Sequence, residues 1–424
     1  MNETRLRFEV VVVGAGPAGL AAACAAAESG RQTALVDDTP WLGGQIWRGQ
    51  QARPTNPQAG QWIDRFRRTK ATVLDQVTIL GPADRRALLA EHPDGPRQIE
   101  WERLILATGA RELFLPFPGW TLPGIFGPGG LQSLAKHGWP VAGKRIVLAG
   151  SGPLLLAVGS GLRKMGANIV SINEQAPLSR MLAFGAGLLR WPEKLVQAVR
   201  LKLTLGGAPF RCGVWPVRAE GGDQVQAVVL TDGRRQWTEE CDFLACGFGL
   251  VPNVELPLAL GCQLDDGFVK VDPWQASSNS GVYAAGELTG IGGADGALVE
   301  GEIAGLAASG SQETAHRLLA RREASHRFRA ALASAFALRK EVVSLAKSET
   351  LLCRCEDVSF DRMKSFTGWR DAKLQTRCGM GSCQGRVCGA AAKVLFGWGM
   401  ESVRPPVLPA RVESLCGAGC DNPS

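Results

Sequence analysis

The chain has 424 residues, of which 45% are hydrophobic and 21% charged, and its formal net charge is +7. A chain of this length can bury sizeable cores, and we expect two or three domains. The charge is spread out, with no basic block interleaved with aromatic residues, which argues against nucleic acid binding. The first residues run directly into an apolar segment, with no signal peptide and no long apolar span. We therefore expect a cytoplasmic chain without a transmembrane segment.

Residues 10–38 (VVVVGAGPAGLAAACAAAESGRQTALVDD) have the pattern of a β-α-β nucleotide-binding unit. A run of valines enters a glycine-rich turn, in which Gly14, Gly16 and Gly19 take the three fingerprint positions. Asp37 ends the second apolar run, where an acidic side chain binds ribose hydroxyls while the pyrophosphate meets the helix N-terminus. The residues expected to contact the nucleotide are Gly14, Gly16, Pro17, Ala18, Gly19, Asp37 and Asp38.

Three later segments identify this nucleotide as FAD. The loop 41–48 (WLGGQIWR) has paired glycines that suit a loop lying against a flat cofactor, and 104–111 (LILATGAR) is an apolar strand that ends in small residues. Residues 281–305 contain a strand that ends in Ala-Gly-acid and leads into a helix; this acid, Glu287, is expected to bind the ribityl chain. No C-x-x-x-x-C dithiol follows the loop 41–48, which argues against a disulfide reductase. The three segments add the following expected contacts: Gly44, Gln45, Arg48, Ala107, Thr108, Gly109, Gly286, Glu287 and Ala294.

Residues 145–174 (RIVLAGSGPLLLAVGSGLRKMGANIVSINE) repeat the β-α-β pattern in a degraded form. Leu155 takes the third fingerprint position and should hold the helix further from its strand. Three alternatives stay open: an NAD(P) site, a site for another adenine nucleotide, and a structural remnant. Glu174 favours NAD over NADP, because an acidic side chain binds a free ribose hydroxyl. The residues expected to line such a site are Gly150, Gly152, Pro153 and Glu174.

Seven of the twelve cysteines lie in the last 72 residues, and in a reducing compartment such a cluster indicates metal rather than disulfides. The segments CRCEDV (353–358) and TRCGMGSCQGRVCG (376–389) can bring four thiolates together from two turns. C-x-C is a poor spacing for zinc, and the flavin favours a redox centre, so we expect a [2Fe–2S] cluster rather than zinc or an empty remnant. The preferred ligands are Cys353, Cys355, Cys383 and Cys388, with Cys378 as the substitute; Cys416 and Cys420 lie in a tail that we expect to be disordered.

Together the motifs predict an α/β chain with two Rossmann-like dinucleotide-binding domains, one inserted in the other, and a small C-terminal helical iron–sulfur domain. Residues 206–243 alternate in short apolar runs that predict a small antiparallel sheet, and 242–253 should return to the first domain. The expected boundaries are 1–114 and 245–310 for the FAD-binding domain, 115–244 for the inserted domain, 311–347 for a linker helix, 348–410 for the iron–sulfur domain and 411–424 for the tail.

These motifs, together with LPFPGWTLPGIFGPGG at residues 115–130, resemble the FAD-containing A/α-type subunit of hetero-oligomeric amine dehydrogenases. This group includes opine oxidase, hydrogen cyanide synthase and D-hydroxyproline dehydrogenase. The chain is also similar to the FAD/NAD half of the α chain of heterotetrameric sarcosine oxidase, and its last domain resembles the bacterioferritin-associated ferredoxins. The resemblance covers nearly the whole chain and implies a fold like that of the pyridine nucleotide-disulfide oxidoreductases.

The resemblance also implies a division of labour between subunits. A D-amino-acid-oxidase-like flavoprotein β subunit would oxidise a CH–NH or CH–NH2 donor, and this chain would pass the electrons to a quinone, a dye or an NAD-linked acceptor. A small ferredoxin-like subunit is a further partner that the resemblance allows, and partners could hold the complex at the inner face of the membrane. The residues agree with this division, because neither a carboxylate-binding arginine clamp nor a general base is identifiable and no catalytic residue is assigned. Two other hypotheses stay open: a self-contained NAD(P)H-dependent FAD/iron–sulfur reductase, and a non-enzymatic protein that holds a cluster.

Overall fold

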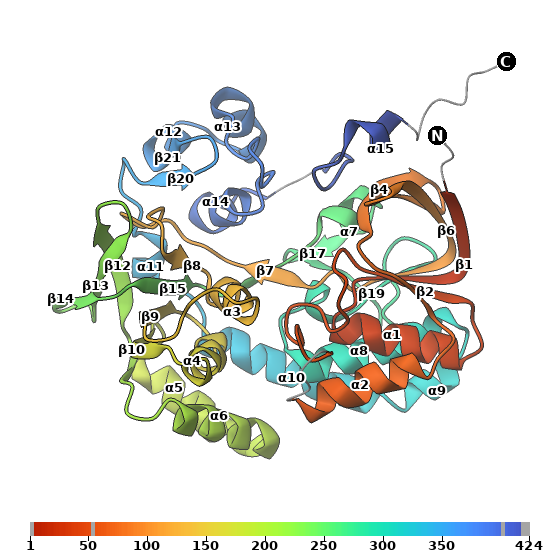
Figure 1. Ribbon diagram of the computed structural model, residues 1–424, viewed down its shortest axis with the longest axis horizontal. Helices are drawn as coiled ribbons and strands as arrows, with labels where there is room; N and C mark the ends of the chain where they lie inside the picture. Colours follow the sequence, from red (N-terminus) through yellow and green to blue (C-terminus); the bar gives the residue numbers. More distant parts are fainter. Residues whose placement is uncertain (1–3, 52–55, 400–402, 417–424) are drawn as a thin grey trace. The chain divides into compact units, whose positions relative to one another are not determined.

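The computed structural model describes residues 4–51, 56–399 and 403–416 (Figure 1). The described residues form two compact units. As far as they are described, Met1–Arg111, Pro252–Arg329 and Glu401–Ser424 make up the first unit, and Glu112–Val251 and Ala330–Met400 make up the second. Among the helices in these residues, none combines the length and the apolar character that a membrane span requires.

The first unit is built on a seven-stranded sheet in the order β3-β2-β1-β6-β5-β4, with β19 paired to β6. The valine run lies at its centre, where Val10–Val13 pair in parallel with Thr33–Val36 on one side and with 103–106 on the other. Both the valine run and β2 are buried, as expected for parallel strands that are covered on both faces. The strands are β1 (Thr4–Val13), β2 (Thr33–Val36), β3 (Thr72–Leu74), β4 (Thr78–Asp84), β5 (Ala87–His92), β6 (Gly95–Leu106) and β19 (Val282–Ala284).

Two helices made of small residues, α1 (Pro17–Glu28) and α8 (Ala294–Ala308), pack closely against each other beside this sheet (Figure 1). A Cβ added at Gly301 would lie 2.1 Å from the Ala18 carbonyl oxygen, so only glycine permits this approach. The contact holds α8 against the helix that carries the first glycine fingerprint. The other elements of the unit are α2 (Pro57–Arg67), α7 (Glu255–Ala259), β17 (Leu264–Asp265), β18 (Phe268–Val269), η2 (Gly286–Leu288), α9 (Gln312–His316) and α15 (Val412–Cys416).

The second unit contains a five-stranded parallel sheet in the order β11-β10-β9-β15-β8. The expectation that 242–253 returns to the first domain is wrong for β15, which pairs with β9 instead. The buried apolar residues 244–246 explain this, because they complete the middle of the second sheet. The elements are β8 (Ile125–Phe126), α3 (Pro128–Lys136), β9 (Arg145–Gly150), α4 (Leu154–Lys164), β10 (Asn168–Glu174), β11 (Phe210–Cys212) and β15 (Phe243–Gly247).

A three-stranded antiparallel sheet, β12-β13-β14, confirms the small sheet predicted in 206–243. Between β10 and β11 the chain forms a helical segment at the periphery of the unit (Figure 1). A short strand pair, β7 and β16, lies where the chain passes between the two units. The elements are β12 (Trp215–Gly221), β13 (Val225–Thr231), β14 (Gln236–Glu240), α5 (Leu178–Gly187), η1 (Leu188–Arg190), α6 (Pro192–Thr204), β7 (Ala110–Glu112) and β16 (Leu250–Pro252).

The cysteine-rich part of the second unit packs on the core of the second sheet. Val387, Ala390 and Val394 lie against the apolar cluster that contains Trp120, whose indole nitrogen donates a hydrogen bond to the Leu351 carbonyl oxygen at 2.7 Å. Apolar and polar contacts therefore both hold the cysteine-rich part on the second sheet. Its elements are β20 (Leu351–Cys353), β21 (Val358–Ser359), α12 (Phe360–Lys364), α13 (Trp369–Thr376) and α14 (Cys388–Phe396).

Two expectations about the connecting segments need correction. Residues 311–347 form three helices instead of one, namely α9, α10 (Leu319–Ala335) and α11 (Lys340–Val343). The start of the tail is a helix, α15, held on β5 because the Ser414 hydroxyl donates to Glu91 Oε2 at 2.6 Å. Cys416 is exposed at the end of this helix, and Cys420 lies outside the described residues.

Candidate functional site

The first glycine fingerprint forms a tight turn between β1 and α1. Gly14 has a φ of +105°, and a Cβ there would lie 2.3 Å from the Ala107 carbonyl oxygen. A Cβ at Gly19 would lie 1.7 Å from the Gly14 carbonyl oxygen, whereas nothing lies within 4 Å of the corresponding position at Gly16. Pro17 takes the first turn of α1, a position that its ring favours. The turn thus leaves open backbone at the helix N-terminus, which is where a pyrophosphate binds.

Asp37 lies at the mouth of this turn with its carboxylate held in place. Its Oδ2 accepts a hydrogen bond from the Ala15 amide at 2.6 Å, and its Oδ1 accepts from the Thr39 amide at 2.9 Å. The side chain of Asp37 remains partly exposed, and Asp38 beside it is exposed. Asp37 therefore lies beside the turn, as predicted for a ribose contact, and its side chain is accessible from solvent.

The loop 41–48 lies directly against the fingerprint. Gly44 has a φ of +55°, and a Cβ there would lie 2.9 Å from the Gly16 Cα atom. Gln45 is exposed and Arg48 is half-buried. Gly44 therefore allows this loop to approach the glycine turn closely. The predicted contact of the loop with a flat cofactor stays a prediction.

The small residues after β6 are held by Asn253. The Asn253 side chain donates to the Thr108 carbonyl oxygen at 2.8 Å, and the Thr108 hydroxyl donates to the Asn253 carbonyl oxygen at 3.0 Å. The Asn253 amide also donates to the Gly109 carbonyl oxygen at 3.0 Å. The Thr108 hydroxyl is thus engaged within the protein, and Asn253 is a supporting residue that no motif identifies.

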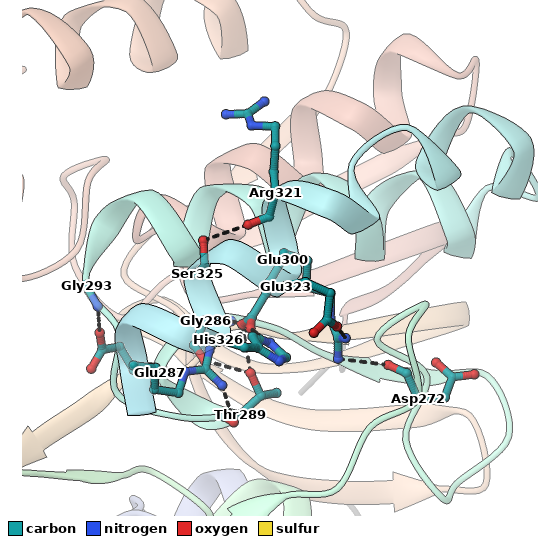
Figure 2. Close-up of polar contacts among 12 residues, drawn as sticks. Asp272, Gly286, Glu287, Thr289, Gly293, Glu300, Arg321, Glu323, Ser325 and His326 are labelled. Atoms are coloured by element: carbon teal, nitrogen blue, oxygen red, sulfur yellow. Dashed lines mark hydrogen bonds and ion pairs between the residues drawn. The ribbon is translucent and has the colours of Figure 1, made fainter. Parts of the chain in front are cut away.

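Glu287 lies in the turn between β19 and α8 (Figure 2). Its Oε1 accepts a hydrogen bond from the Gly293 amide at 2.9 Å, just before Ala294 begins α8. Its Oε2 is buried and has no hydrogen-bond partner among the described residues, and burial raises the pKa of this carboxyl. A buried polar atom without a partner costs free energy, and a cofactor hydroxyl would supply the missing bond. The turn that Gly286 opens therefore fits the ribityl chain of FAD.

Beneath this turn lies a buried carboxylate, Glu300, with 0% exposure. It accepts hydrogen bonds from the Gly286 amide at 2.9 Å and the Thr289 hydroxyl at 2.7 Å (Figure 2). Arg329 and His326 of α10 contact its other oxygen at 2.6 and 3.0 Å. Although burial opposes it, these contacts hold the pKa of Glu300 below its ordinary value. The network fixes the turn from below, since Arg329 also donates to the Thr289 carbonyl oxygen at 2.7 Å.

No motif identifies this network. The segment 294–308 contains three acids, Asp295, Glu300 and Glu302, and nothing in the sequence shows that Glu300 is the buried one. Arg329 and His326 lie in a stretch with many basic residues, where nothing local distinguishes them.

The second fingerprint also forms a tight turn. Gly150 has a φ of +137°, and a Cβ there would lie 1.8 Å from the Gly247 carbonyl oxygen. Glu174 accepts hydrogen bonds from the Gly152 amide and from a second amide, both at 2.8 Å. Burial raises the pKa of Glu174 to about 7. Leu155 is buried in the core, and Pro153 is exposed. The residues predicted to line a second nucleotide site therefore lie at one turn, but the side chain of Glu174 is buried.

Residues 336–339, which follow α10, lie across this second turn. The Ser151 hydroxyl donates to the carbonyl oxygen of Phe336 at 3.0 Å. The buried Gln175 side chain donates to the Ala337 carbonyl oxygen at 3.3 Å and accepts from the Arg339 amide at 3.1 Å. We call residues 336–339 the strap. It engages the polar groups beside the glycine turn that a nucleotide would otherwise meet.

Three of the predicted cysteines form a buried group. The sulfur atoms of Cys353, Cys378 and Cys388 all lie within 4.8 Å of one another. Cys383 is half-buried, and Cys355 is exposed with its sulfur 3.9 Å from the Ser382 hydroxyl. The structure thus brings Cys378, the substitute in the sequence-based set, into the group, which includes neither Cys355 nor Cys383.

The electrostatics of this part of the chain favour a thiolate at Cys353 and at Cys383. They oppose one at Cys378 and Cys388, because hydrogen bonds to Cys353 raise the pKa of both thiols. Hydrogen bonds from the Cys378 and Cys388 thiols lower the pKa of Cys353, and a hydrogen bond from Cys388 lowers the pKa of Cys383 to about 5. The backbone amides of Gly379 and residue 356 contribute at Cys353. Soft thiolates with backbone amide donors suit a transition-metal centre.

The glycine-rich turn at the start of α1 and the acidic turn at the start of α8 together have the pattern of an FAD-binding fold, and the second unit contains another fold of the dinucleotide-binding type. These features define an FAD-dependent oxidoreductase with two dinucleotide-binding folds. The chain belongs to the pyridine nucleotide-disulphide oxidoreductase family, whose sequence pattern matches residues 8–315. This confirms the predicted fold class and the predicted FAD-dependent oxidoreductase.

Within the family, the chain is similar to components of hetero-oligomeric oxidases, as predicted. It is 31% identical over 423 residues to the HcnB subunit of hydrogen cyanide synthase from Pseudomonas aeruginosa, covering 90% of this chain and 91% of that protein. It is 30% identical over 463 residues to the A-type subunit of opine oxidase from Agrobacterium tumefaciens, covering 96% and 91%. The alpha subunit of sarcosine oxidase from Corynebacterium is 30% identical over 318 residues, which are 68% of this chain and 31% of that protein.

Solved structures share the fold. L-proline dehydrogenase from P. horikoshii matches with a TM-score of 0.71 at 19% identity, over 98% of this chain and 80% of that chain. Thioredoxin reductase from T. acidophilum matches with a TM-score of 0.55 at 22% identity, over 72% and 99%. These likenesses concern the fold alone.

Proposed function

We propose that this chain is the electron-transferring subunit of a hetero-oligomeric amine dehydrogenase or oxidase of the imino acid, opine or D-hydroxyproline type. It would use FAD and a [2Fe–2S] cluster to relay electrons from a partner flavoprotein to an acceptor. The observation that carries the proposal is the buried group of Cys353, Cys378 and Cys388 in a chain with an FAD-binding fold. A flavin takes up two electrons and an iron–sulfur cluster takes up one, so the pair suits a relay.

The residues around the flavin turn support the assignment of C–N oxidation to a partner. Binding a substrate carboxylate needs an available arginine. Arg329, next to the Glu287 turn, is committed to Glu300, and Arg111 forms an ion pair with Glu255 at 2.9 Å. A D-amino-acid-oxidase-like β subunit would therefore supply the substrate pocket, and the relatives that are named as subunits support such a partner.

FAD, when bound, supplies the two-electron chemistry, and this chain positions it. The open backbone at Gly16 and the N-terminus of α1 would meet the pyrophosphate. The Asp37 carboxylate would accept hydrogen bonds from the ribose hydroxyls, and the unpaired Oε2 of Glu287 would accept one from a ribityl hydroxyl. Arg329 and Glu300 would keep the Glu287 turn in place.

For the cluster we retain the set Cys353, Cys355, Cys383 and Cys388, because each of the two turns then supplies a pair of thiolates. Cys353 and Cys388 belong to both this set and the buried group. Cys378, the third member of the buried group, is the substitute for one of the other two ligands. A cytoplasmic location, where thiols stay reduced, suits such a centre.

Serine substitutions separate the two ligand sets. We expect Cys355→Ser and Cys383→Ser each to abolish the visible absorbance of the cluster and the bound iron, while Cys378→Ser retains both. Cys24→Ser, a change at a buried cysteine of the first unit, is the matched control for loss of a thiol. Iron retained in Cys355→Ser and lost in Cys378→Ser would assign the ligand to Cys378.

A second candidate is an NADH-dependent FAD/iron–sulfur reductase. Glu174 favours it, because this acid lies beside the second glycine turn, where a ribose would bind. The strap opposes it, because Ser151 and Gln175 already have hydrogen bonds to residues 336–339. We therefore place this candidate second.

Anaerobic spectroscopy tests the choice. We expect NADH to leave the flavin of the isolated chain oxidised, and an amine substrate to reduce both centres only when the partner flavoprotein is present. Prompt bleaching of the flavin by NADH in the isolated chain would support the reductase instead. Reduction of neither centre in the assembled complex would contradict the relay.

A further inference from the structure

The helical segment between β10 and β11 has apolar side chains that the rest of its unit does not cover. We define the α5–α6 face by Leu178, Leu182, Leu189, Val196, Val199 and Leu203, which expose 47–74% of their surface. These are six of the fourteen exposed large hydrophobic side chains in the described part of the chain, within 26 residues. Single exposed apolar residues need no explanation, but a concentration of this kind marks an interaction surface.

The spacing along the helices shows that these side chains form stripes. Leu178 and Leu182 are four residues apart on α5, and Val196, Val199 and Leu203 are three and four residues apart on α6. Residues at these spacings lie on one side of a helix. Neither α5 nor α6 has a buried residue of its own. Since about half or more of each of these side chains is exposed, each helix presents an aliphatic stripe to the solvent.

The charges around the stripes have one dominant sign. Residues 178–204 contain five Lys or Arg side chains and a single acid, Glu193. The positive residues are Arg180, Arg190, Lys194, Arg200 and Lys202, and α4, which packs on α6, adds Arg163 and Lys164 at its C-terminal end. A second copy of this face would bring like charges together, which disfavours self-association. The complementary surface is therefore anionic.

We propose that the α5–α6 face docks on an anionic lipid surface, with the leucine and valine stripes entering the interface and the basic side chains contacting the headgroups. Helices that lie in a membrane interface combine an aliphatic side with flanking Lys and Arg. The long basic side chains can reach the headgroups while their methylene groups cover apolar surface. The chain would thus lie on a membrane through its own helices, whatever its partner subunit does.

Vesicle co-sedimentation of the full chain tests the proposal. We expect binding to phosphatidylcholine vesicles that contain phosphatidylglycerol, little binding to pure phosphatidylcholine, and weaker binding as salt increases. Leu182→Glu and Leu203→Glu should each lower the partition coefficient on the order of tenfold or more. Leu374→Glu changes a single exposed aliphatic residue on α13, outside the α5–α6 face, so it is the matched control and should bind like the wild type.

The double variant Arg200→Glu/Lys202→Glu alters charge without adding polarity to the stripes, and it should also lose binding to anionic vesicles. Flavin absorbance and circular dichroism report whether each variant is folded. Wild-type chain that does not bind anionic vesicles, or binding that survives both leucine substitutions, overturns the proposal. Self-association that Leu203→Glu abolishes, without vesicle binding, would assign the face to a second copy. These outcomes are independent of the electron-relay role, which the anaerobic experiment tests separately.

Discussion

The two glycine-rich folds of this chain have the same local design and different surroundings. At the first turn, Gly16 faces open space and Asp37 is partly exposed. At the second, Gly152 also faces open space, but Glu174 is enclosed and the neighbouring polar groups are bonded to the strap. The difference teaches that a fingerprint specifies a turn, while residues later in the chain determine how accessible the polar groups beside that turn are. In the first unit these later residues form the Glu287 turn, and in the second unit they form the strap.

The largest expected effect comes from breaking the first turn. Gly14→Ala places a Cβ 2.3 Å from a backbone oxygen at a φ of +105°, so the turn must move and we expect protein without flavin. Gly150→Ala makes an equivalent clash in the second turn and should lower stability but retain the flavin. Flavin absorbance of the purified variants measures both. Gly185→Ala, which meets nothing within 4 Å, is the control. Flavin lost equally from the Gly150 variant would show that the two folds are not separate in function.

The next effect concerns the support of the Glu287 turn. Arg329→Met leaves the fully buried Glu300 carboxylate without its charged partner, and we expect a loss of about 3–5 kcal/mol in the free energy of unfolding. Flavin affinity should fall as well, because the same arginine holds the Thr289 carbonyl oxygen. Combining it with Glu300→Gln should restore part of the stability. Denaturant unfolding and flavin titration measure the two quantities, and an unchanged flavin affinity would contradict the positioning role.

Glu174 gives the second fold a pH dependence with a definite sign. Its folded pKa of about 7 lies above the ordinary value of 4.5, so the folded state holds a proton that the unfolded state has lost between these pH values. The stability that this group contributes is therefore present below pH 4.5 and is lost as the pH rises to 7, on the order of 3 kcal/mol. Glu174→Gln should remove this slope, so the variant gains on the wild type as the pH rises. Unfolding curves across this range that stay parallel would contradict this.

The smallest effect concerns the strap. Gln175→Ala removes a buried side chain that bonds to two strap residues, and we expect a loss of about 1–2 kcal/mol with no change in the flavin spectrum. Hydrogen exchange of residues 336–339 should become faster. Gln61→Ala, a change to an exposed glutamine on α2 of the first unit, is the matched control. Unchanged exchange of the strap would show that Gln175 does not hold it.

The sequence predicts the parts of the molecule that rest on local pattern. The valine run, the turn at Gly14 and the acid at Glu287 depend on residues close together in the chain, and the family match confirms the fold that they imply. The contact of Ser151 with Phe336 joins residues far apart in the chain, and such contacts leave no local pattern. The pairing of β15 with β9 could not be predicted for a related reason, since the sequence of a short buried strand does not indicate which strand lies beside it. The ligand choice between Cys355 and Cys378 stays a prediction.

The packing of the cysteine-rich part determines where this chain can be divided. Val387, Ala390 and Val394 complete the apolar cluster of the second sheet, and Trp120 is bonded to Leu351. A gene shortened before residue 348 would encode a second fold with an uncovered apolar face. The cysteine-rich part is therefore not a separable domain but belongs to the second unit.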